Sequence, residues 1–235
     1  MRTPAIIKDI AHCISEYIFP RCCHICGTIL IDNEAYICTT CRSKLPRTLY
    51  HRTYMNPMEQ RFAGIFPFER GSGHFFYAGD SDLSVLMHDL KYRHYKGLAE
   101  EMGKIVAQEL ITTPFLSDID MILPIPMHFL KKARRGYNQT EEIAKGIHSI
   151  TGIPVKTNLR ATRPHRTQTK LTFDERRNNT KGIFKVTEEC ELKGKHILLL
   201  DDVCTTGSTL TSAATEILQA APTSRISLLT IGVTF

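Results

Sequence analysis

A buried strand that ends in two acids and a tight turn is the feature that most constrains this fold. Ile197–Leu200 is a run of four large apolar residues, as a strand covered on both faces requires. Asp201 and Asp202 follow directly, and Thr205–Thr209 leads into a helical pattern that begins at Leu210. Open α/β sheets bind ligands at the carboxyl ends of their strands. The run therefore predicts a polar ligand site at the end of a buried parallel strand.

The rest of residues 61–235 alternates between strand and helix patterns. Expected strands are 62–68 and 75–78 around a turn at 71–73, then 121–125, 197–200 and 226–233. Expected helices are 83–90 (capped by Asp80 or Ser81), 98–106, 143–147 (stopping near Gly152) and 210–218. This order predicts an α/β fold with a parallel-sheet core and helices on both faces. A chain of 235 residues, 42% of them hydrophobic, can build one such core and a small additional module.

The turn after the acids has the chemistry of a phosphate site. Gly207 lets the backbone approach a ligand closely, and Ser208 or Thr209 can cap the helix that follows. Helix N-termini favour phosphate, and carboxylates suit ribose hydroxyls and Mg²⁺. An ordinary capped turn is the alternative, but the acid pair and the turn Thr205–Thr209 in one register favour the ligand site. No Walker motif occurs in the chain.

Two C-x-x-C pairs near the N-terminus predict a zinc site. The candidate ligands are Cys23, Cys26, Cys38 and Cys41, and eleven residues separate the two pairs. Facing turns of this kind can place four thiolates tetrahedrally around Zn²⁺, and metal binding would stabilise a module too small for its own core. A redox C-x-x-C or coincidence is the alternative. Cys22 leaves the first ligand ambiguous, and His24 is expected to be a bystander.

The predicted domains are a helix and zinc module over 1–46, a linker over 47–60 and the α/β domain over 61–235. Ile6–Ile18 has helical spacing, and we expect this helix to dock on the neighbouring module. Binding to a membrane surface is the alternative, although the polar face is not rich in Lys or Arg. No apolar run is long enough to span a bilayer, so no stable membrane insertion is expected. Paired cysteines and the lack of a secretion signal predict a cytoplasmic protein.

Positive charge is concentrated in one part of the chain. Met127–Ile183 contains 13 Lys and Arg against 4 Asp and Glu, which is a local charge of +9. We therefore expect this segment to bind an anion. Lys91–Lys96 interleaves bases with Tyr92 and Tyr95, which suits stacking on single-stranded nucleic acid. Both segments have the alternative interpretation of solvated surface.

The run Ile197–Leu210 resembles the PRPP motif of type I phosphoribosyltransferases, an apolar strand followed by two acids and a Thr-Gly turn. Further motifs are similar to those of the ComF (ComFC) competence family. They are LPIP at Leu123–Pro126, RRGYNQ at Arg134–Gln139, the cysteine module, and the segment from Arg166 through Gln168, Leu171, Arg176 and Asn178 to Phe184. The resemblance implies a type I phosphoribosyltransferase fold preceded by a small zinc ribbon.

The resemblance also implies which residues bind PRPP with Mg²⁺. Asp201 and Asp202 would hold the ribose hydroxyls. Thr205, Thr206, Gly207, Ser208 and Thr209 would cradle the 5′-phosphate. Arg135, Gly136, Tyr137, Asn138 and Gln139 would frame the pyrophosphate. Arg166, Gln168, Arg176 and Asn178 belong to the segment 160–181, which corresponds to the flexible loop of the family.

Two functional hypotheses follow. The first is a phosphoribosyltransferase acting in DNA uptake, which transfers phosphoribosyl to an unidentified acceptor and releases pyrophosphate. The second is a single-stranded-DNA-binding competence protein whose PRPP site is regulatory or vestigial. The intact Asp201–Asp202 pair favours retained PRPP binding, whereas no residue identifies a catalytic base or an acceptor pocket. Other competence or DNA-uptake proteins are expected partners in either case.

Overall fold

The computed structural model describes residues 20–93, 95–162 and 182–234 of the chain. The chain divides into two compact units, Met1–Leu45 and Pro46–Phe235. The helix expected at Ile6–Ile18 lies outside the described residues. No helix of the described residues is long and apolar enough to cross a membrane.

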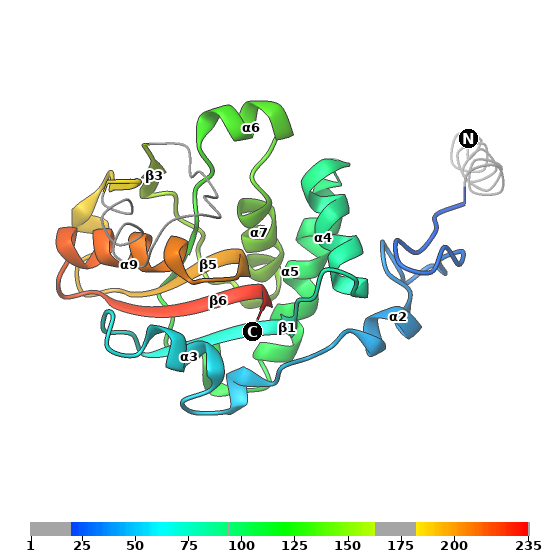
Figure 1. Cartoon of the computed structure of the whole chain (residues 1–235), viewed down its shortest axis with the longest axis horizontal. Coiled ribbons are helices and arrows are strands. Elements are labelled where there is room, and N and C mark those ends of the chain that lie inside the picture. Colours follow the sequence, from blue (N-terminus) through cyan, green and yellow to red (C-terminus); the bar gives the residue numbers. More distant parts are fainter. Residues whose placement is uncertain (1–19, 94, 163–181, 235) are drawn as a thin grey trace, which may run out of the picture. The chain divides into compact units, whose positions relative to one another are not determined.

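Helices and strands alternate along the second unit, as the apolar pattern predicts (Figure 1). The first unit contains the short helix α2 (Thr39–Lys44). The elements of the second unit are η1 (Tyr50–Arg52), α3 (Pro57–Phe62), β1 (Arg70–Phe76), α4 (Asp82–Tyr92), α5 (Lys96–Leu110), η2 (Pro114–Leu116), β2 (Met121–Pro124), α6 (Phe129–Arg135), α7 (Gln139–Thr151), β3 (Leu159–Ala161), β4 (Phe184–Val186), η3 (Glu189–Glu191), β5 (His196–Cys204), α9 (Ser208–Ala220) and β6 (Arg225–Val233).

Within the described residues, four strands form one sheet in the order β1-β6-β5-β2, and every pair in it is parallel. Leu200 of β5 pairs with Pro124 of β2 and Leu229 of β6, so β5 is an interior strand. The strands β3 and β4 form a separate antiparallel pair. The predicted parallel sheet is confirmed, and it places the end of β5 at the carboxyl edge between two neighbouring strands.

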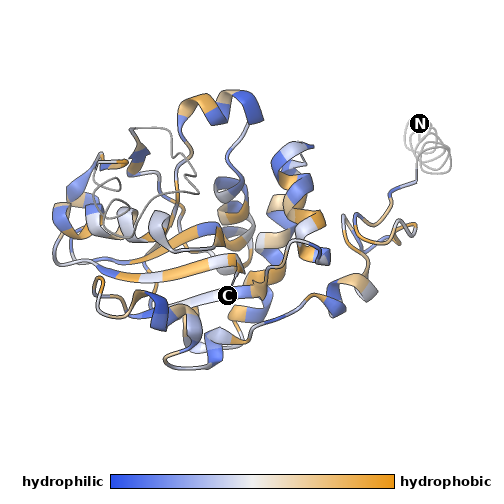
Figure 2. Cartoon of the chain, viewed as in Figure 1, coloured by the Kyte–Doolittle hydropathy of each residue, from blue (hydrophilic) through white to orange (hydrophobic). Residues whose placement is uncertain are grey.

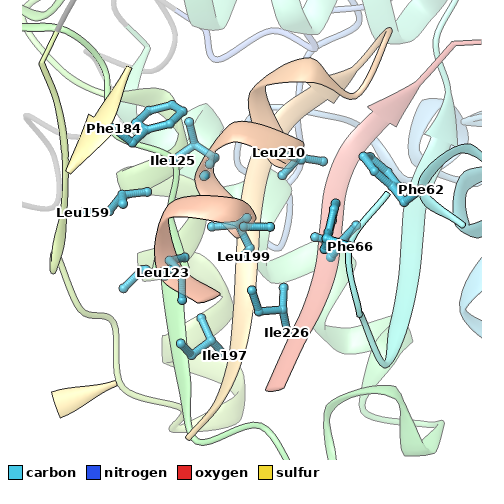
Figure 3. Packing of buried hydrophobic residues seen from close by; sticks show 14 of the residues in the cluster. Phe62, Phe66, Leu123, Ile125, Leu159, Phe184, Ile197, Leu199, Leu210 and Ile226 are labelled. Atoms are coloured by element: carbon cyan, nitrogen blue, oxygen red, sulfur yellow. The ribbon is translucent and has the colours of Figure 1, made fainter. Parts of the chain in front are cut away.

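Helices cover both faces of the sheet, with α9 on one face and α5 and α7 on the other (Figure 1). On the α9 face, Ile197 and Leu199 of β5 belong to one hydrophobic cluster with Leu210 of α9 (Figure 3). Side chains alternate along a strand, so Leu198 and Leu200 point to the opposite face, and both are fully buried. Burying a leucine side chain stabilises the fold by roughly 1.5–3 kcal/mol, so these alternating residues anchor β5 from both sides.

The helices α5 and α7 pack together at two glycines. A Cβ atom at Gly103 would lie 2.1 Å from the carbonyl oxygen of Ile143, and one at Gly146 would lie 2.0 Å from the carbonyl oxygen of Glu100. A larger side chain at either position would push the helices apart. This close approach keeps α7 against β2 and β5, so the start of α7 lies near the carboxyl edge of the sheet.

Two predicted elements near residue 70 are wrong. Residues 62–68 do not form a strand, because α3, capped by Asn56, runs to Phe62 and is followed by a turn with Gly64 at φ 75. The predicted turn at Gly71–Gly73 is instead the buried interior of β1. A Cβ atom at Gly73 would lie 2.4 Å from Cβ of Val233, so this glycine permits close approach to β6 and makes no turn.

Two other segments are more ordered than the sequence indicates. Residues 47–60, expected to be a linker, lie within the second unit, where Arg47 pairs with Glu109 at 2.7 Å and Tyr50 is buried. The basic segment after β2, for which no element was expected, contains α6, whose residues are all partly or fully exposed. Neither segment has an apolar period. The helix α6 lies at the surface, and residues 47–60 contact the core through single residues such as Tyr50.

Candidate functional site

The acid pair lies in the last part of β5. The Asp201 carboxylate accepts a hydrogen bond from the Asp202 amide at 2.8 Å, and the Asp202 carboxylate accepts one from the Val203 amide at 2.7 Å. The second oxygen of Asp202 lies 3.1 Å from Nζ of Lys91, in the last turn of α4. Burial, and then the neighbouring Asp202 charge, raises the pKa of Asp201 well above its usual value. The pair therefore combines one ion-paired carboxylate with one that resists ionisation.

Basic side chains from two helices lie near this pair. Burial, and then the positive charges of Arg135 and Lys91, lowers the pKa of Lys131 in α6, while the Asp202 charge opposes this shift. The guanidinium of Arg135 lies 5.7 Å from the ring centre of Tyr92 in α4. In Figure 1, α4 and α6 both project beyond the sheet. The arrangement places a cationic group of two helices opposite the carboxyl end of β5.

The turn after β5 is held in place by backbone geometry. Gly207 has φ 78 and precedes the first residue of α9, which makes it the N-cap. The expectation that Ser208 or Thr209 caps the helix is wrong, because the left-handed backbone required there favours glycine. The Thr206 hydroxyl donates to Oγ of Ser208 at 3.1 Å. The first amides of α9 have no carbonyl of a preceding turn to bind and are suited to an anion.

The segment Arg135–Gln139 uses most of its polar groups internally. Tyr137 donates its hydroxyl proton to the Leu90 carbonyl, and Gln139 donates to the same oxygen at 3.4 Å. Asn138 caps α7 and donates to the Ile125 carbonyl at 3.0 Å. Tyr137, Asn138 and Gln139 are all buried, so this segment ties the end of β2 to α4. Only Arg135 and Gly136 of the five candidate residues reach the surface.

The four predicted cysteines come together in the first unit. The sulfur atoms of Cys23, Cys26, Cys38 and Cys41 all lie within 4.8 Å of one another, and they form the one such cluster found among the described residues. The sulfurs of Cys26 and Cys38 are 3.7 Å apart. A tetrahedral site with Zn–S bonds of roughly 2.3 Å has sulfur–sulfur edges of about 3.8 Å. The geometry therefore fits one zinc ion.

Hydrogen bonds and burial act in opposite directions on the thiols of the cluster. The Cys38 amide donates to the Cys23 sulfur at 3.4 Å, and the Cys41 amide donates to the Cys38 sulfur at 3.4 Å. Hydrogen bonds with Thr28 lower the pKa of the Cys26 thiol to about 6. Burial instead raises the pKa of the Cys41 thiol. A bound cation would favour the deprotonated form of all four ligands.

The geometry favours Cys23 over Cys22 as the first candidate ligand. Cys22 is exposed, its sulfur lies 3.5 Å from the Pro20 carbonyl, and it stands outside the cluster. The His24 ring lies against Tyr36, with the ring centres 5.8 Å apart, and is likewise outside the cluster. Four cysteines thus form the candidate metal site without either neighbour.

Two contacts of the site have no counterpart in the sequence motifs. Lys91 belongs to the Lys91–Lys96 cluster, which suggests nucleic acid, yet it pairs with Asp202. Arg61 of α3 contacts the carbonyls at the end of β5. No local pattern signals either contact, because both join segments far apart in the chain. The candidates Arg166, Gln168, Arg176 and Asn178 lie outside the described residues.

A parallel sheet with an acid pair and a glycine turn at its carboxyl edge is the arrangement of a domain that binds sugar phosphates or nucleotides. The family model "Phosphoribosyl transferase domain" matches residues 98–231, which contain the acid pair and the turn. The chain therefore belongs to this family.

Similar proteins narrow the assignment. "DNA utilization protein YhgH" of Escherichia coli O157:H7 is 31% identical over 144 residues, which make up 58% of this chain and 61% of that protein. "Competence protein F" of Haemophilus influenzae is 29% identical over 133 residues, 54% of this chain and 58% of that protein. The chain thus spans about three fifths of these curated relatives. Their names support the ComF family that the sequence motifs predict.

The solved structures that resemble the chain include a glutamine phosphoribosylpyrophosphate (PRPP) amidotransferase from B. subtilis complexed with ADP and GMP. It is 19% identical with a TM-score of 0.40, and the match covers 59% of this chain and 26% of that one.

Proposed function

We propose that the second unit binds PRPP with Mg²⁺ and transfers its phosphoribosyl group to an unidentified acceptor, releasing pyrophosphate. The observation that carries this proposal is the Asp201–Asp202 pair, which lies beside the Gly207 turn and within reach of Lys91. PRPP carries ribose hydroxyls between its two phosphate ends. The turn, the acid pair and the cation follow one another in the same order. Carboxylates accept hydrogen bonds from ribose hydroxyls, while amides and cations bind phosphates.

In this proposal each end of PRPP has its own place. The turn Thr205–Thr209 holds the 5′-phosphate at the N-terminus of α9, and the acid pair holds the ribose hydroxyls. The pyrophosphate lies toward α6, where Lys131 and Arg135 supply positive charge. The family resemblance implies that residues 160–181 correspond to the flexible loop of the family, and residues 163–181 lie outside the part of the chain that the structure describes.

The reaction would break the bond between ribose C1 and the pyrophosphate oxygen and form one from C1 to the acceptor. Negative charge grows on the departing pyrophosphate while positive charge grows on the ribose. The basic groups of α6 would stabilise the first of these charges, because positioned cations favour negative charge that develops in the transition state. Mg²⁺, when bound, would neutralise further charge on the phosphates.

The names of the relatives support a role in DNA utilisation or competence, with other DNA-uptake proteins as partners. The first unit would act as a zinc-binding accessory module, because its four thiols fit Zn²⁺. Reduced, closely spaced thiols persist in the cytoplasm, where we place the protein.

Single-stranded DNA is a second candidate ligand, favoured by exposed aromatic rings beside basic residues. The side chains of Tyr92, Tyr95 and Phe129 are 58%, 40% and 67% exposed. Tyr92 lies beside Arg135, so the ends of α4 and α6 present one surface. In Figure 2, α6 is hydrophobic at its start and hydrophilic at its end. Exposed rings among bases suit stacking on nucleobases.

Isothermal titration with PRPP and Mg²⁺ tests the main proposal. We expect wild type to bind PRPP, and the double variant Asp201→Asn with Asp202→Asn to lose binding, because hydrogen bonds to charged groups contribute roughly 1.5–3 kcal/mol each. A folded double variant that binds PRPP as wild type does would place the site elsewhere. A screen of amines and bases for pyrophosphate release then identifies the acceptor.

A further inference from the structure

Arg61, near the end of α3, contacts the outer side of the turn Thr205–Thr209. Its Nη1 donates to the Thr205 carbonyl and lies 3.5 Å from the Cys204 carbonyl oxygen. Its Nη2 donates to the Thr234 carbonyl at 2.6 Å. One side chain thus joins the end of β5 to the residue that follows β6.

These contacts fix the direction of the neighbouring amides. A trans peptide is planar, so its C=O and N–H point to opposite sides, and the described residues contain no cis peptide bond. The carbonyls of Cys204 and Thr205 point toward Arg61. The N–H groups of Thr205 and Thr206 therefore point away from α3, on the exposed face of the turn. Two successive N–H groups on one face form a concavity that binds anions.

The next residue of α3 supports the same turn. Phe62 is fully buried, and a Cβ atom at Gly207 would lie 2.7 Å from its ring. Figure 3 shows Phe62 in the cluster that contains Leu210 of α9. The helix α3 thus binds carbonyls of the turn with Arg61 and packs behind the turn with Phe62. It precedes residues 98–231, which the family model matches.

We infer that Arg61 is a positioning residue, which holds the turn Thr205–Thr209 from behind so that the Thr205 and Thr206 amides face the 5′-phosphate. The inference rests on the proposed PRPP function. A guanidinium suits this role because its fork of donors reaches several acceptors at once, whereas a lysine ammonium is a point charge.

The first test needs no ligand. Amide hydrogen exchange is measured by NMR for wild type, Arg61→Ala and the control Gln60→Ala, an exposed neighbour in α3 whose side-chain amide donates to the Met55 carbonyl at 2.7 Å. The reporters are the Thr234 and Thr211 amides, which donate to Cys204 and Gly207 at 3.0 and 2.9 Å. We expect faster exchange at both in Arg61→Ala alone. Unchanged exchange in this variant would overturn the inference.

The second test separates the two ends of the ligand. Ribose 5-phosphate and pyrophosphate are titrated separately into wild type, Arg61→Ala, Arg61→Lys and Gln60→Ala. We expect Arg61→Ala to bind ribose 5-phosphate about tenfold more weakly, the effect of losing one hydrogen bond to a charged group, with pyrophosphate affinity unchanged. Arg61→Lys should show a similar loss, because it keeps the charge and loses the fork.

The outcomes distinguish this inference from the proposed function. Equal loss of both ligands, or Arg61→Lys binding like wild type, would overturn the positioning role, since the first indicates general damage and the second a pure charge effect. Failure of wild type to bind PRPP or ribose 5-phosphate would overturn the proposed function and the phosphate contact together. Hydrogen exchange still decides, in that case, whether Arg61 holds the turn.

Discussion

Nζ of Lys91 lies 3.1 Å from a carboxylate oxygen of Asp202, and this ion pair joins the last turn of α4 to the end of β5. Both side chains are partly buried, at 25% and 20% exposure. The Lys91 charge also lowers the pKa of Asp201, against the larger effects of burial and of Asp202. A lysine from a helix that precedes the matched family domain thus sets the charge balance of the acid pair.

We predict that Lys91→Met weakens PRPP binding by about tenfold, because the anionic ligand would meet two carboxylates without their nearest cation. Titration calorimetry measures the change. The matched control is Lys145→Met, since Lys145 pairs with Glu142 on the exposed side of α7 and should leave affinity unaltered. Tighter binding by Lys91→Met would show instead that Lys91 competes with the ligand for Asp202.

We predict that Asp201→Asn stabilises the ligand-free fold near neutral pH. Burial raises the folded-state pKa of Asp201 above its unfolded value, so the folded state binds this proton more tightly. That stability is complete below the unfolded pKa of about 3.9 and is lost as the pH rises through the folded pKa. The neutral Asn side chain does not ionise, so the variant keeps this stability as the pH rises. Relative to wild type, its free energy of unfolding rises by about 1.4 kcal/mol for each unit by which the folded and unfolded pKa values of Asp201 differ.

Thermal unfolding of both proteins over a pH series checks this prediction. The difference in Tm should be largest near neutral pH and vanish toward pH ~4. Asp202→Asn is the contrasting variant, because it loses the ion pair with Lys91 and should gain no stability. Equal Tm values for wild type and Asp201→Asn at neutral pH would mean that Asp201 ionises in the folded protein without cost.

The strands β2, β5 and β6 and the helices α7 and α9 could be predicted because each has a clear apolar pattern, whereas α6, β3 and β4 were not expected. The strand β5 and the helices α7 and α9 are examples, and Gly152 ends α7 in the left-handed conformation that glycine favours. The segment from α3 to β1 could not be predicted. Its phenylalanines alternate as in a strand, while the capping of α3 by Asn56 decides the fold, and the glycines of β1 reflect packing against β6.

The candidate site shows the same division. The acids and the turn are contiguous in sequence, so one motif identified them together. The contacts of Lys91 and Arg61 depend on how α4 and α3 pack against the sheet, and no spacing in the sequence encodes them. Buried Asn138 and Gln139 belong to a recognisable motif, but only the structure shows that their side chains hold α7 to β2 and α4.

We predict one Zn²⁺ per chain, bound by Cys23, Cys26, Cys38 and Cys41, because their sulfurs all lie within 4.8 Å of one another and thiolates are zinc ligands. Metal analysis of the purified protein measures the stoichiometry. The double variant Cys38→Ser with Cys41→Ser should contain no zinc. Cys22→Ser is the matched control and should keep it, since Cys22 lies outside the cluster. Zinc retained by the double variant would refute the assignment.

The surface formed by the ends of α4 and α6 leads to the last prediction. Tyr92 is 58% exposed beside Arg135, and Phe129 is 67% exposed in the same helix as Arg134. The +9 charge of Met127–Ile183 exceeds what one PRPP requires, although Lys132 is already paired with Glu141 at 2.9 Å. We therefore predict weak, sequence-tolerant binding of single-stranded DNA, stronger than that of duplex, because only unpaired bases can stack on the rings.

Fluorescence anisotropy with a labelled oligonucleotide at several salt concentrations measures this binding. Released counterions should make affinity fall with a log–log slope of about −0.7 per neutralised phosphate, and Lys131→Glu with Arg134→Glu should flatten that slope. Tyr92→Ala and Phe129→Ala should each weaken binding by roughly 1–3 kcal/mol. Tyr54→Ala is the control, because Tyr54 is 87% exposed but lies between η1 and α3. Equal losses of DNA affinity in Tyr92→Ala, Phe129→Ala and Tyr54→Ala would show that the DNA-binding surface lies elsewhere. If wild type does not bind the oligonucleotide at low salt, the basic residues serve PRPP binding alone.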